Sequence, residues 1–270
     1  MPEGDTVYLA AARLRSALAG KILTRSDFRV PRYATLDLRG SRVDSVGSYG
    51  KHLFVRTETL SIHTHLKMEG TWRIYRPGQR WTKPGFTARL ILATADTEAV
   101  GFSLGLVEVL RLADEHTAVD HLGPDLLGPN WDAAEAVRRL RTDPERPIGL
   151  ALLDQTTMAG VGNIFRSEIC FAERVHPATP VAAVPDLPGL VDAAHRILGR
   201  AAHHPPRPAV VYGRQRQPCP RCGSMILVRM LGSDATSASA PATERGIYFC
   251  PRCQPAPETP EPRTAGRTRG

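Results

Sequence analysis

The sequence contains no long hydrophobic run. No apolar stretch in its 270 residues reaches the roughly 18 residues that a membrane-spanning helix requires. Nothing after Met1 resembles a basic region followed by an apolar segment and a cleavage site, which is the pattern of a secretory signal. We therefore expect a cytoplasmic protein that has neither a targeting signal nor contact with a membrane.

Lysine is scarce, and acidic residues are outnumbered. Only four of the 35 basic residues are lysines (Lys21, Lys51, Lys67 and Lys83), and the 27 acidic residues leave a formal net charge of +8. Such a surplus favours a polyanionic partner over an acidic small molecule. With 42% hydrophobic and 23% charged residues, the composition is that of a globular protein and excludes collagen-like and wholly disordered chains.

Cysteine is also rare, and four of the five cysteines form two C-x-x-C pairs. Two sulfurs at this spacing can reach one tetrahedral ion at about 2.3 Å. The pairs predict one structural Zn²⁺, held by Cys219, Cys222, Cys250 and Cys253. Two redox-active dithiols are the alternative. The fifth, Cys170, lies in an apolar helical stretch and is expected to be a small buried residue.

Periodicity predicts an α+β protein. A helix is expected over residues 5–19, with Asp5 or Thr6 as its N-cap and Gly20 at its end. Six strand-like runs without an intervening helix then favour an antiparallel sandwich, at 36–38, 52–56, 60–63, 71–75, 89–93 and 107–110. Helices are predicted at 132–141, 147–153, 164–172 and 187–203, before a hairpin with strands at 225–228 and 247–249.

The first residues carry the sharpest chemical signal. A Met before a small residue is normally removed, which would leave Pro2 with a free secondary amine. An α-amino group has a pKa of about 8, so part of it is neutral and nucleophilic at neutral pH. Attack of a secondary amine on a sugar C1′ gives a cationic iminium, the electron sink that elimination requires. Glu3 can protonate the leaving base or the opening sugar ring.

Two further motifs accompany this start. Gly50-Lys51-His52 places one of the four lysines at the entry of a predicted strand. Residues 158–168 read as a turn with two glycines followed by a helix. Backbone N–H groups at such a turn and helix N-terminus predict an anion site for a DNA phosphate.

Five motifs together resemble the Fpg/Nei family of bifunctional DNA glycosylases over residues 2–253. They are Pro-Glu-Gly at 2–4, Gly-Lys-His at 50–52, Gly-Val-Gly-Asn at 160–163, Val-Tyr-Gly-Arg at 211–214, and the four paired cysteines. The resemblance implies an N-terminal antiparallel β-sandwich with an N-terminal helix, a helical helix–two-turn–helix domain and a C-terminal β-hairpin zinc finger. The corresponding boundaries are a catalytic domain at 1–120, a DNA-binding domain at 121–208, the finger at 209–254 and a disordered tail at 255–270.

The resemblance also implies a reaction. Pro2 would form a Schiff base with the damaged nucleotide, Glu3 would be the proton donor, and Lys51 would contact the lesion-flanking phosphate and assist the chemistry. The implied activity is that of a base-excision-repair DNA glycosylase and AP lyase that cleaves the strand by β/δ-elimination. Damaged DNA is the implied partner, and we expect a nucleoid-associated monomer.

Three more residues match DNA-contacting positions of the family. Asn163 and Arg245 would bind phosphates, and Met68 would fill the hole left by the everted base. These roles agree with the physics of base flipping, in which phosphate contacts hold a kinked strand while an apolar side chain replaces the lost stacking.

Departures from the family pattern favour its endonuclease VIII branch, which removes oxidised pyrimidines. The Arg-Phe pair that 8-oxoguanine enzymes insert beside the wedge is absent, and Phe-Ser-Leu-Gly-Leu stands at 102–106. The link at 201–208 is too short and proline-rich for the long loop that caps 8-oxoguanine. A third departure does not bear on the branch: the start reads Pro-Glu-Gly-Asp-Thr, without the family's second glutamate, so that a neighbouring carboxylate is missing.

Three alternatives stay open at this point. One is a preference for 8-oxoguanine or formamidopyrimidine within the same family. A non-enzymatic zinc DNA-binding protein would explain the charge and the cysteines, but not Pro2-Glu3 with Lys51. A tautomerase that uses an N-terminal proline as a base would be a shorter chain with no need of a finger.

Overall fold

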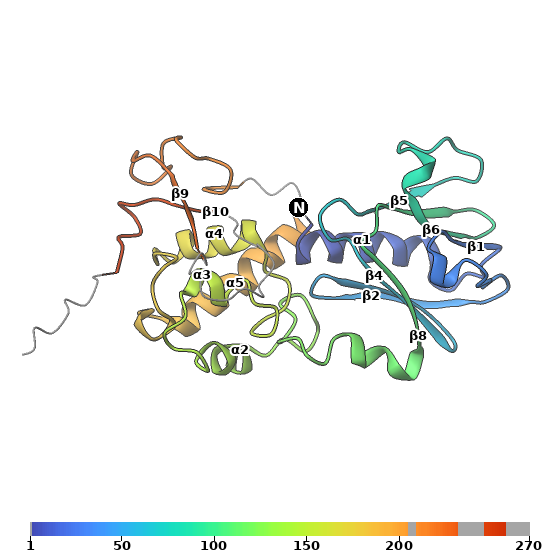
Figure 1. Ribbon diagram of the computed structural model, residues 1–270, viewed down its shortest axis with the longest axis horizontal. Helices are drawn as coiled ribbons and strands as arrows, with labels where there is room; N and C mark the ends of the chain where they lie inside the picture. The colour runs from blue at the N-terminus through green and yellow to red at the C-terminus, as the bar shows by residue number, and fades with distance from the viewer. Residues whose placement is uncertain (1, 205–208, 232–245, 258–270) are drawn as a thin grey trace, which may run out of the picture.

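The computed structural model describes residues 2–204, 209–231 and 246–257, and all structural statements below concern these ranges. The molecule is elongated, with most of its strands at one end and most of its helices at the other (Figure 1). None of the helices in the described ranges is both long and apolar enough to cross a membrane.

The N-terminal half is an antiparallel sandwich, as the sequence predicts. Helix α1 (Gly4–Leu18) is followed by two four-stranded sheets with the orders β1-β6-β7-β5 and β2-β3-β4-β8. Apolar side chains of α1 and of both sheets share one buried cluster. The strands are β1 (Arg25–Phe28), β2 (Val43–Tyr49), β3 (His52–Thr57), β4 (Leu60–His65), β5 (Thr71–Tyr75), β6 (Ala88–Ala93), β7 (Glu98–Phe102) and β8 (Leu106–Arg111).

The second half is helical and has its own buried cluster. Its helices are α2 (Ala133–Leu140), α3 (Ile148–Ala151), α4 (Asn163–Ala172) and α5 (Leu187–His203). The predicted bounds of the last helix are confirmed. Short 3₁₀ segments connect the elements: η1 (Pro31–Tyr33), η2 (Gly85–Thr87), η3 (Leu112–Ala118) and η4 (Val181–Ala183).

The cysteine-bearing hairpin packs against α4. Its strands, β9 (Leu227–Met230) and β10 (Gly246–Phe249), pair antiparallel, which confirms the predicted hairpin. The Arg221 guanidinium donates to the carbonyl of Phe171 at the end of α4 (2.6 Å). The second half of the proline-rich link (205–208), residues 232–245 between the two hairpin strands, and most of the tail at 255–270 lie outside the described residues.

Two sequence expectations are wrong. Residues 36–38 form no strand, although Leu38 is buried, and strands β1, β2 and β7 were not expected. The N-cap of α1 is Glu3, not Asp5 or Thr6, and the Glu3 side chain makes no capping hydrogen bond to α1. That carboxylate is bound to another helix.

Candidate active site

The Glu3 carboxylate lies at the N-terminus of α4. It is fully buried and accepts hydrogen bonds from the backbone N–H groups of Gly162 (2.9 Å), Ile164 (2.7 Å) and Phe165 (3.2 Å). Three N–H donors and the positive end of the helix stabilise a negative charge on this side chain. The expectation that these N–H groups bind a DNA phosphate is therefore wrong, because the anion at this helix end is the protein's own carboxylate.

Close backbone approaches at glycines bring the segments of the site together. The Gly4 N–H donates to the Gly160 carbonyl (2.9 Å), and a Cβ on Gly4 would lie 2.9 Å from the Gly160 Cα. Gly50 has φ of +54°, and a Cβ there would lie 2.7 Å from the Ala159 Cβ. At Gly162, a Cβ would collide with the Glu3 carboxylate. The start of the chain, the β2–β3 turn and the turn before α4 thus form one packed unit.

Lys51 reaches the same turn. Its Nζ donates to the Val161 carbonyl (2.6 Å). Pro2, which is half-buried, precedes Glu3 directly and so lies at the same unit. The structure therefore brings Pro2, Glu3 and Lys51 together around the turn that leads into α4.

Asn163 begins α4 and is 5% exposed. Its Nδ2 donates to the Gly246 carbonyl (3.2 Å), and its Oδ1 accepts from Arg166 Nε (2.7 Å). The amide thus connects the turn to the β9–β10 hairpin. Arg245 lies outside the described residues, but its chain neighbour Gly246 is the hairpin residue that Asn163 contacts.

Met68 projects from the β4–β5 connection. It is 54% exposed, and the preceding Lys67 has φ of +52°. An exposed apolar side chain on a short turn fits the expected wedge.

The four paired cysteines converge. Their ligand atoms lie within 4.8 Å of one another, with Sγ–Sγ distances of 3.9 Å between Cys219 and Cys253 and 3.4 Å between Cys222 and Cys250. Sulfurs at about 2.3 Å from a tetrahedral ion are separated by about 3.8 Å. The cluster can hold a metal ion. Cys170 is fully buried, and burial raises the pKa of its thiol to about 12, which agrees with the inert role expected for it.

Comparisons with known proteins decide the family. Models of the formamidopyrimidine-DNA glycosylase N-terminal domain and H2TH domain match residues 1–104 and 122–204. The Streptomyces coelicolor protein named probable endonuclease 8 2 is 48% identical over 99% of this chain and 98% of its own length. The chain belongs to the formamidopyrimidine-DNA glycosylase/endonuclease VIII family. It is a base-excision-repair DNA glycosylase and AP lyase.

Other relatives agree with the family recognised from the motifs. The Mycolicibacterium smegmatis protein named DNA-(apurinic or apyrimidinic site) lyase Nei2 is 47% identical over 95% of this chain and all of its own. The fold also matches that of a solved Lactococcus lactis formamidopyrimidine-DNA glycosylase bound to DNA with an AP site. That match has a TM-score of 0.80 at 22% identity and covers 94% of this chain and 100% of the other.

A histidine array beside Lys51 in this family member was not predicted from the sequence. His52 Nδ1 lies 2.8 Å from His63 Nε2, and His63 Nδ1 lies 3.2 Å from the Glu108 carboxylate. Because the carboxylate can only accept, His63 donates through Nδ1 and accepts from His52 Nδ1–H. The alternating His-Thr-His at 63–65, which places two imidazoles on one face of a strand, was the available signal.

Burial keeps this array neutral. Desolvation, reinforced by the neighbouring histidines and by Lys67, lowers the pKa of His52 to about 3. Desolvation, reinforced by Lys67 and Lys51, lowers the pKa of His65 to about 4. Desolvation also lowers the pKa of His63, although Glu108 opposes the shift. These rings act as neutral donors and acceptors at physiological pH.

Acid should therefore destabilise the fold. Folded-state pKa values below the ordinary 6.5 mean that the unfolded chain binds protons first as the pH falls from about 6.5 towards 4. After allowance for partial exposure of the rings, we expect the free energy of unfolding to fall by about 1–2 kcal/mol between pH 7 and 5. Urea denaturation at both pH values measures this. A His52→Gln/His65→Gln protein with the same pH dependence would contradict the assignment.

Proposed function

We propose that this glycosylase/lyase removes oxidised pyrimidines from DNA, with the N-terminal amine of Pro2 as its nucleophile. The observation that carries the proposal is the convergence of Pro2, Glu3 and Lys51 on the turn before α4. An amine, a fixed carboxylate and a cation in one place are the groups that covalent removal of a base and cleavage of its phosphodiester require.

The reaction begins at the sugar. After removal of Met1, the neutral amine of Pro2 attacks C1′, the C1′–N bond breaks, and the departing base takes a proton from water. Opening of the C1′–O4′ bond then yields the cationic iminium. Water takes a C2′ proton, the electron pair of that C–H bond moves towards the iminium, and the C3′–O bond to the 3′ phosphate breaks. A second elimination from C4′ expels the 5′ phosphate.

Glu3 serves as the proton carrier in this scheme. Three backbone N–H groups stabilise the Glu3 carboxylate as an anion, and Glu3 is the residue that follows Pro2 in the chain. The secondary amine gives up a proton as it bonds to C1′, and the Glu3 carboxylate can take that proton and deliver it to O4′. The same negative charge stabilises the iminium.

Lys51, Asn163 and Arg245 hold the phosphates beside the lesion in this proposal, and Met68 fills the space of the everted base. Exposure of Met68 supports the wedge role. The contact of Asn163 with Gly246 supports a joint phosphate site, because it brings the hairpin residue next to Arg245 to the start of α4.

The metal that the four cysteines would hold is Zn²⁺ in a structural role. Four sulfur ligands at C-x-x-C spacing suit zinc and leave no open position for chemistry. The finger reaches the site through α4, since Tyr248 N–H donates to Ser167 Oγ (3.3 Å). Elemental analysis should find one zinc per chain, and a metal-free active protein would contradict the proposal.

We also propose that the domains divide as the sequence indicates, at 120/121 and 208/209. The sandwich and the helices have separate hydrophobic clusters, and the finger has a third cluster that includes only Phe171 of the helical part. These clusters support the division. The protein acts as a nucleoid-associated monomer on damaged DNA.

A lesion panel tests the substrate. We expect thymine glycol and dihydropyrimidines to be excised faster than 8-oxoguanine, because saturated pyrimidines have lost stacking and cost less to evert. Single-turnover rates in matched duplexes measure the order. Faster excision of 8-oxoguanine opposite cytosine than of thymine glycol opposite adenine would favour the alternative, a formamidopyrimidine-type preference.

A further inference from the structure

The connection between β5 and β6 belongs to a long stretch without acidic residues. Residues 70–95 contain no Asp or Glu but five basic residues: Arg73, Arg76, Arg80, Lys83 and Arg89. In a chain that carries 27 acidic residues, this stretch is a local concentration of positive charge.

Most of these cations are not neutralised. Arg73, Arg76 and Arg80 are exposed, and Lys83 is half-buried. None of these four side chains forms an ion pair or a hydrogen bond within the part of the chain that the structure describes; the one bond at Arg76 to a side chain is from its backbone N–H to Gln79 Oε1 (3.0 Å). By contrast, Arg89 donates to the backbone carbonyl of Phe86 (3.0 Å).

The connection is nevertheless firmly built. Trp81 Nε1 donates to Glu98 (2.6 Å), and the Arg29 guanidinium lies 5.5 Å from the Trp81 ring centroid. Tyr75 and Thr82 hydroxyls are 2.9 Å apart across its base. Residues 79–85 line a shallow hollow of about 590 Å³. These contacts fix the backbone of the β5–β6 connection, so its charged side chains extend from a well-defined structure.

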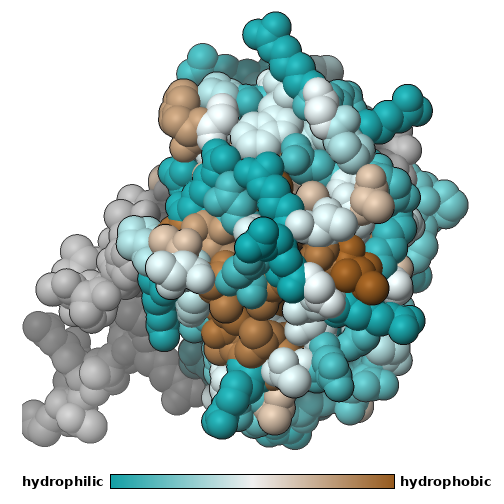
Figure 2. All heavy atoms as spheres, turned by 90° about the vertical axis from the view of Figure 1, so that its right-hand side faces the viewer, coloured by the Kyte–Doolittle hydropathy of each residue, from teal (hydrophilic) through white to brown (hydrophobic). Residues whose placement is uncertain are grey.

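An aromatic ring accompanies the charges. Phe86 is 82% exposed, more than any other large hydrophobic side chain among the described residues. Figure 1 shows that this connection rises above α1, on the same side of the molecule as the β9–β10 hairpin. Figure 2, which keeps the same vertical direction, shows long hydrophilic side chains projecting at the top of this end.

We propose that the β5–β6 connection is a second DNA-binding surface, which holds the sugar–phosphate backbone of the duplex outside the lesion-flanking phosphates. Arg76, Arg80 and Lys83 neutralise phosphates, and Phe86 packs on the deoxyribose. The charge selects a polyanion, and the position selects the DNA that the active site already holds. This inference rests on the proposed function only in taking DNA as the substrate.

Salt dependence of binding tests the proposal in the full-length protein. Each phosphate contact contributes about 0.9 to the slope of log affinity against log salt concentration. We expect Arg80→Ala/Lys83→Ala to lower the slope by about 1.8 and the affinity at about 0.1 M salt by about tenfold or more, on undamaged and abasic-analogue duplexes alike. Phe86→Ala should weaken binding with the slope unchanged, since it removes no charge.

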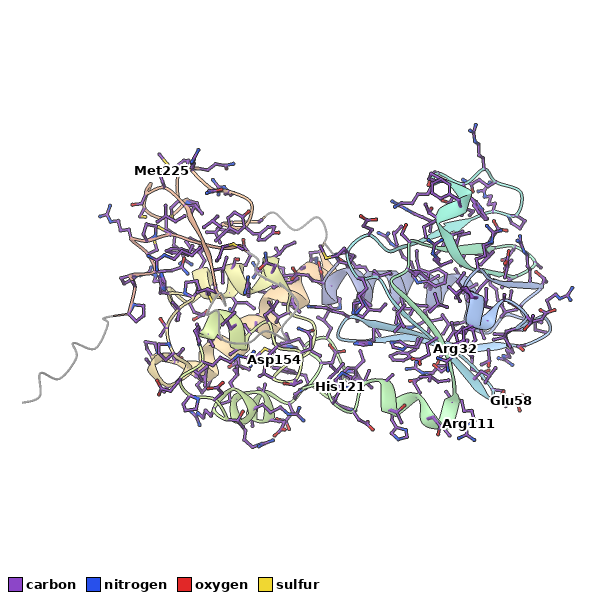
Figure 3. The ribbon with its side chains drawn as sticks, viewed as in Figure 1. Arg32, Glu58, Arg111, His121, Asp154 and Met225 are labelled. Atoms are coloured by element: carbon purple, nitrogen blue, oxygen red, sulfur yellow. The ribbon has the colours of Figure 1, made fainter. Side chains whose placement is uncertain are left out.

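A control variant that loses the same charge distinguishes direct phosphate contacts from a general effect of the protein's net charge. Arg32 and Arg111 lie below α1 in Figure 3, away from the β5–β6 connection. Arg32→Ala/Arg111→Ala removes the same two charges and should leave the slope within about 0.5 of the unmodified protein's. An unchanged slope in Arg80→Ala/Lys83→Ala, an equal loss in the control, or full affinity in Phe86→Ala would overturn the proposal.

The rate of base excision distinguishes a failure of this binding surface from a failure of the proposed function. Arg80→Ala/Lys83→Ala leaves Pro2, Glu3 and Lys51 intact, so its single-turnover excision rate at saturating enzyme should equal that of the unmodified protein. If Arg80→Ala/Lys83→Ala lowers the salt slope as expected but the unmodified protein excises no lesion, the proposed function is contradicted and the DNA-binding surface is supported. A loss of the saturated rate in the variant would instead contradict a purely binding role for the surface.

Discussion

A protein whose Pro2 nitrogen is blocked should bind damaged DNA but cleave none of it. Retention of Met1 or acetylation of Pro2 converts the amine into an amide, which has no nucleophilic lone pair. No iminium then forms, and we expect the rate of strand cleavage at an abasic site to fall by about 10³-fold or more. Gel assays on an abasic duplex under single-turnover conditions measure this.

The matched control uses one chain in two states. A protein with an N-terminal extension is compared with the same protein after a protease has removed the extension and left Pro2 first. Both forms should bind an abasic-analogue duplex within a fewfold of each other, while only the processed form cleaves. Equal cleavage by both forms would exclude Pro2 as the nucleophile.

Gly162→Ala should disable base excision while preserving the fold. A methyl group at this position collides with the Glu3 carboxylate, and φ at Gly162 is −123°, which alanine adopts without strain. The side chain must therefore leave its three N–H partners. We expect excision to fall by about 10²-fold or more, because positioned proton transfer contributes about 10²–10⁴-fold, with a smaller loss on abasic sites.

Gly199→Ala is the control for this substitution. Gly199 lies within α5, and a Cβ there meets no atom within 4 Å, so its activity and melting temperature should stay near or above those of the unmodified protein. Combining Gly162→Ala with Glu3→Gln should cost little more than Glu3→Gln alone. An additive loss would mean that Gly162 acts by a route other than Glu3.

The sequence predicted those helices and strands in which the spacing of apolar residues matches the residues that are buried. Strand β5 (Thr71–Tyr75) and helix α5 (Leu187–His203) have the predicted bounds. The helix predicted over 132–141 is α2, and the structure adds its cap, because the Asp132 side chain accepts from Glu135 N–H (2.9 Å). Strand β2 was not predicted because Gly47 interrupts its strand-like pattern. A Cβ at this position would crowd the Arg56 guanidinium, which pairs with Glu115. Its glycine thus serves a tertiary contact at the expense of local strand propensity.

The sequence predicted which residues form the candidate site, but not the contacts that bring them together. Motifs identified Pro2, Glu3 and Lys51, yet no local pattern states that Glu3 binds the N-terminus of a helix about 160 residues later. The same contact explains the error at the start of α1, where Asp5 and Thr6 looked like better caps than Glu3. Contacts between distant segments are set by the packing of the whole fold, and a motif read along the chain does not reveal them.

Borohydride trapping followed by mass spectrometry tests the central claim most directly. Reduction during turnover on a thymine glycol duplex should fix one nucleotide remnant to the protein, and tryptic digestion should place it on the peptide from Pro2 to Arg13, at the proline nitrogen. An adduct on Lys51, or efficient cleavage with no trapped adduct, would contradict the assignment of Pro2 as the nucleophile.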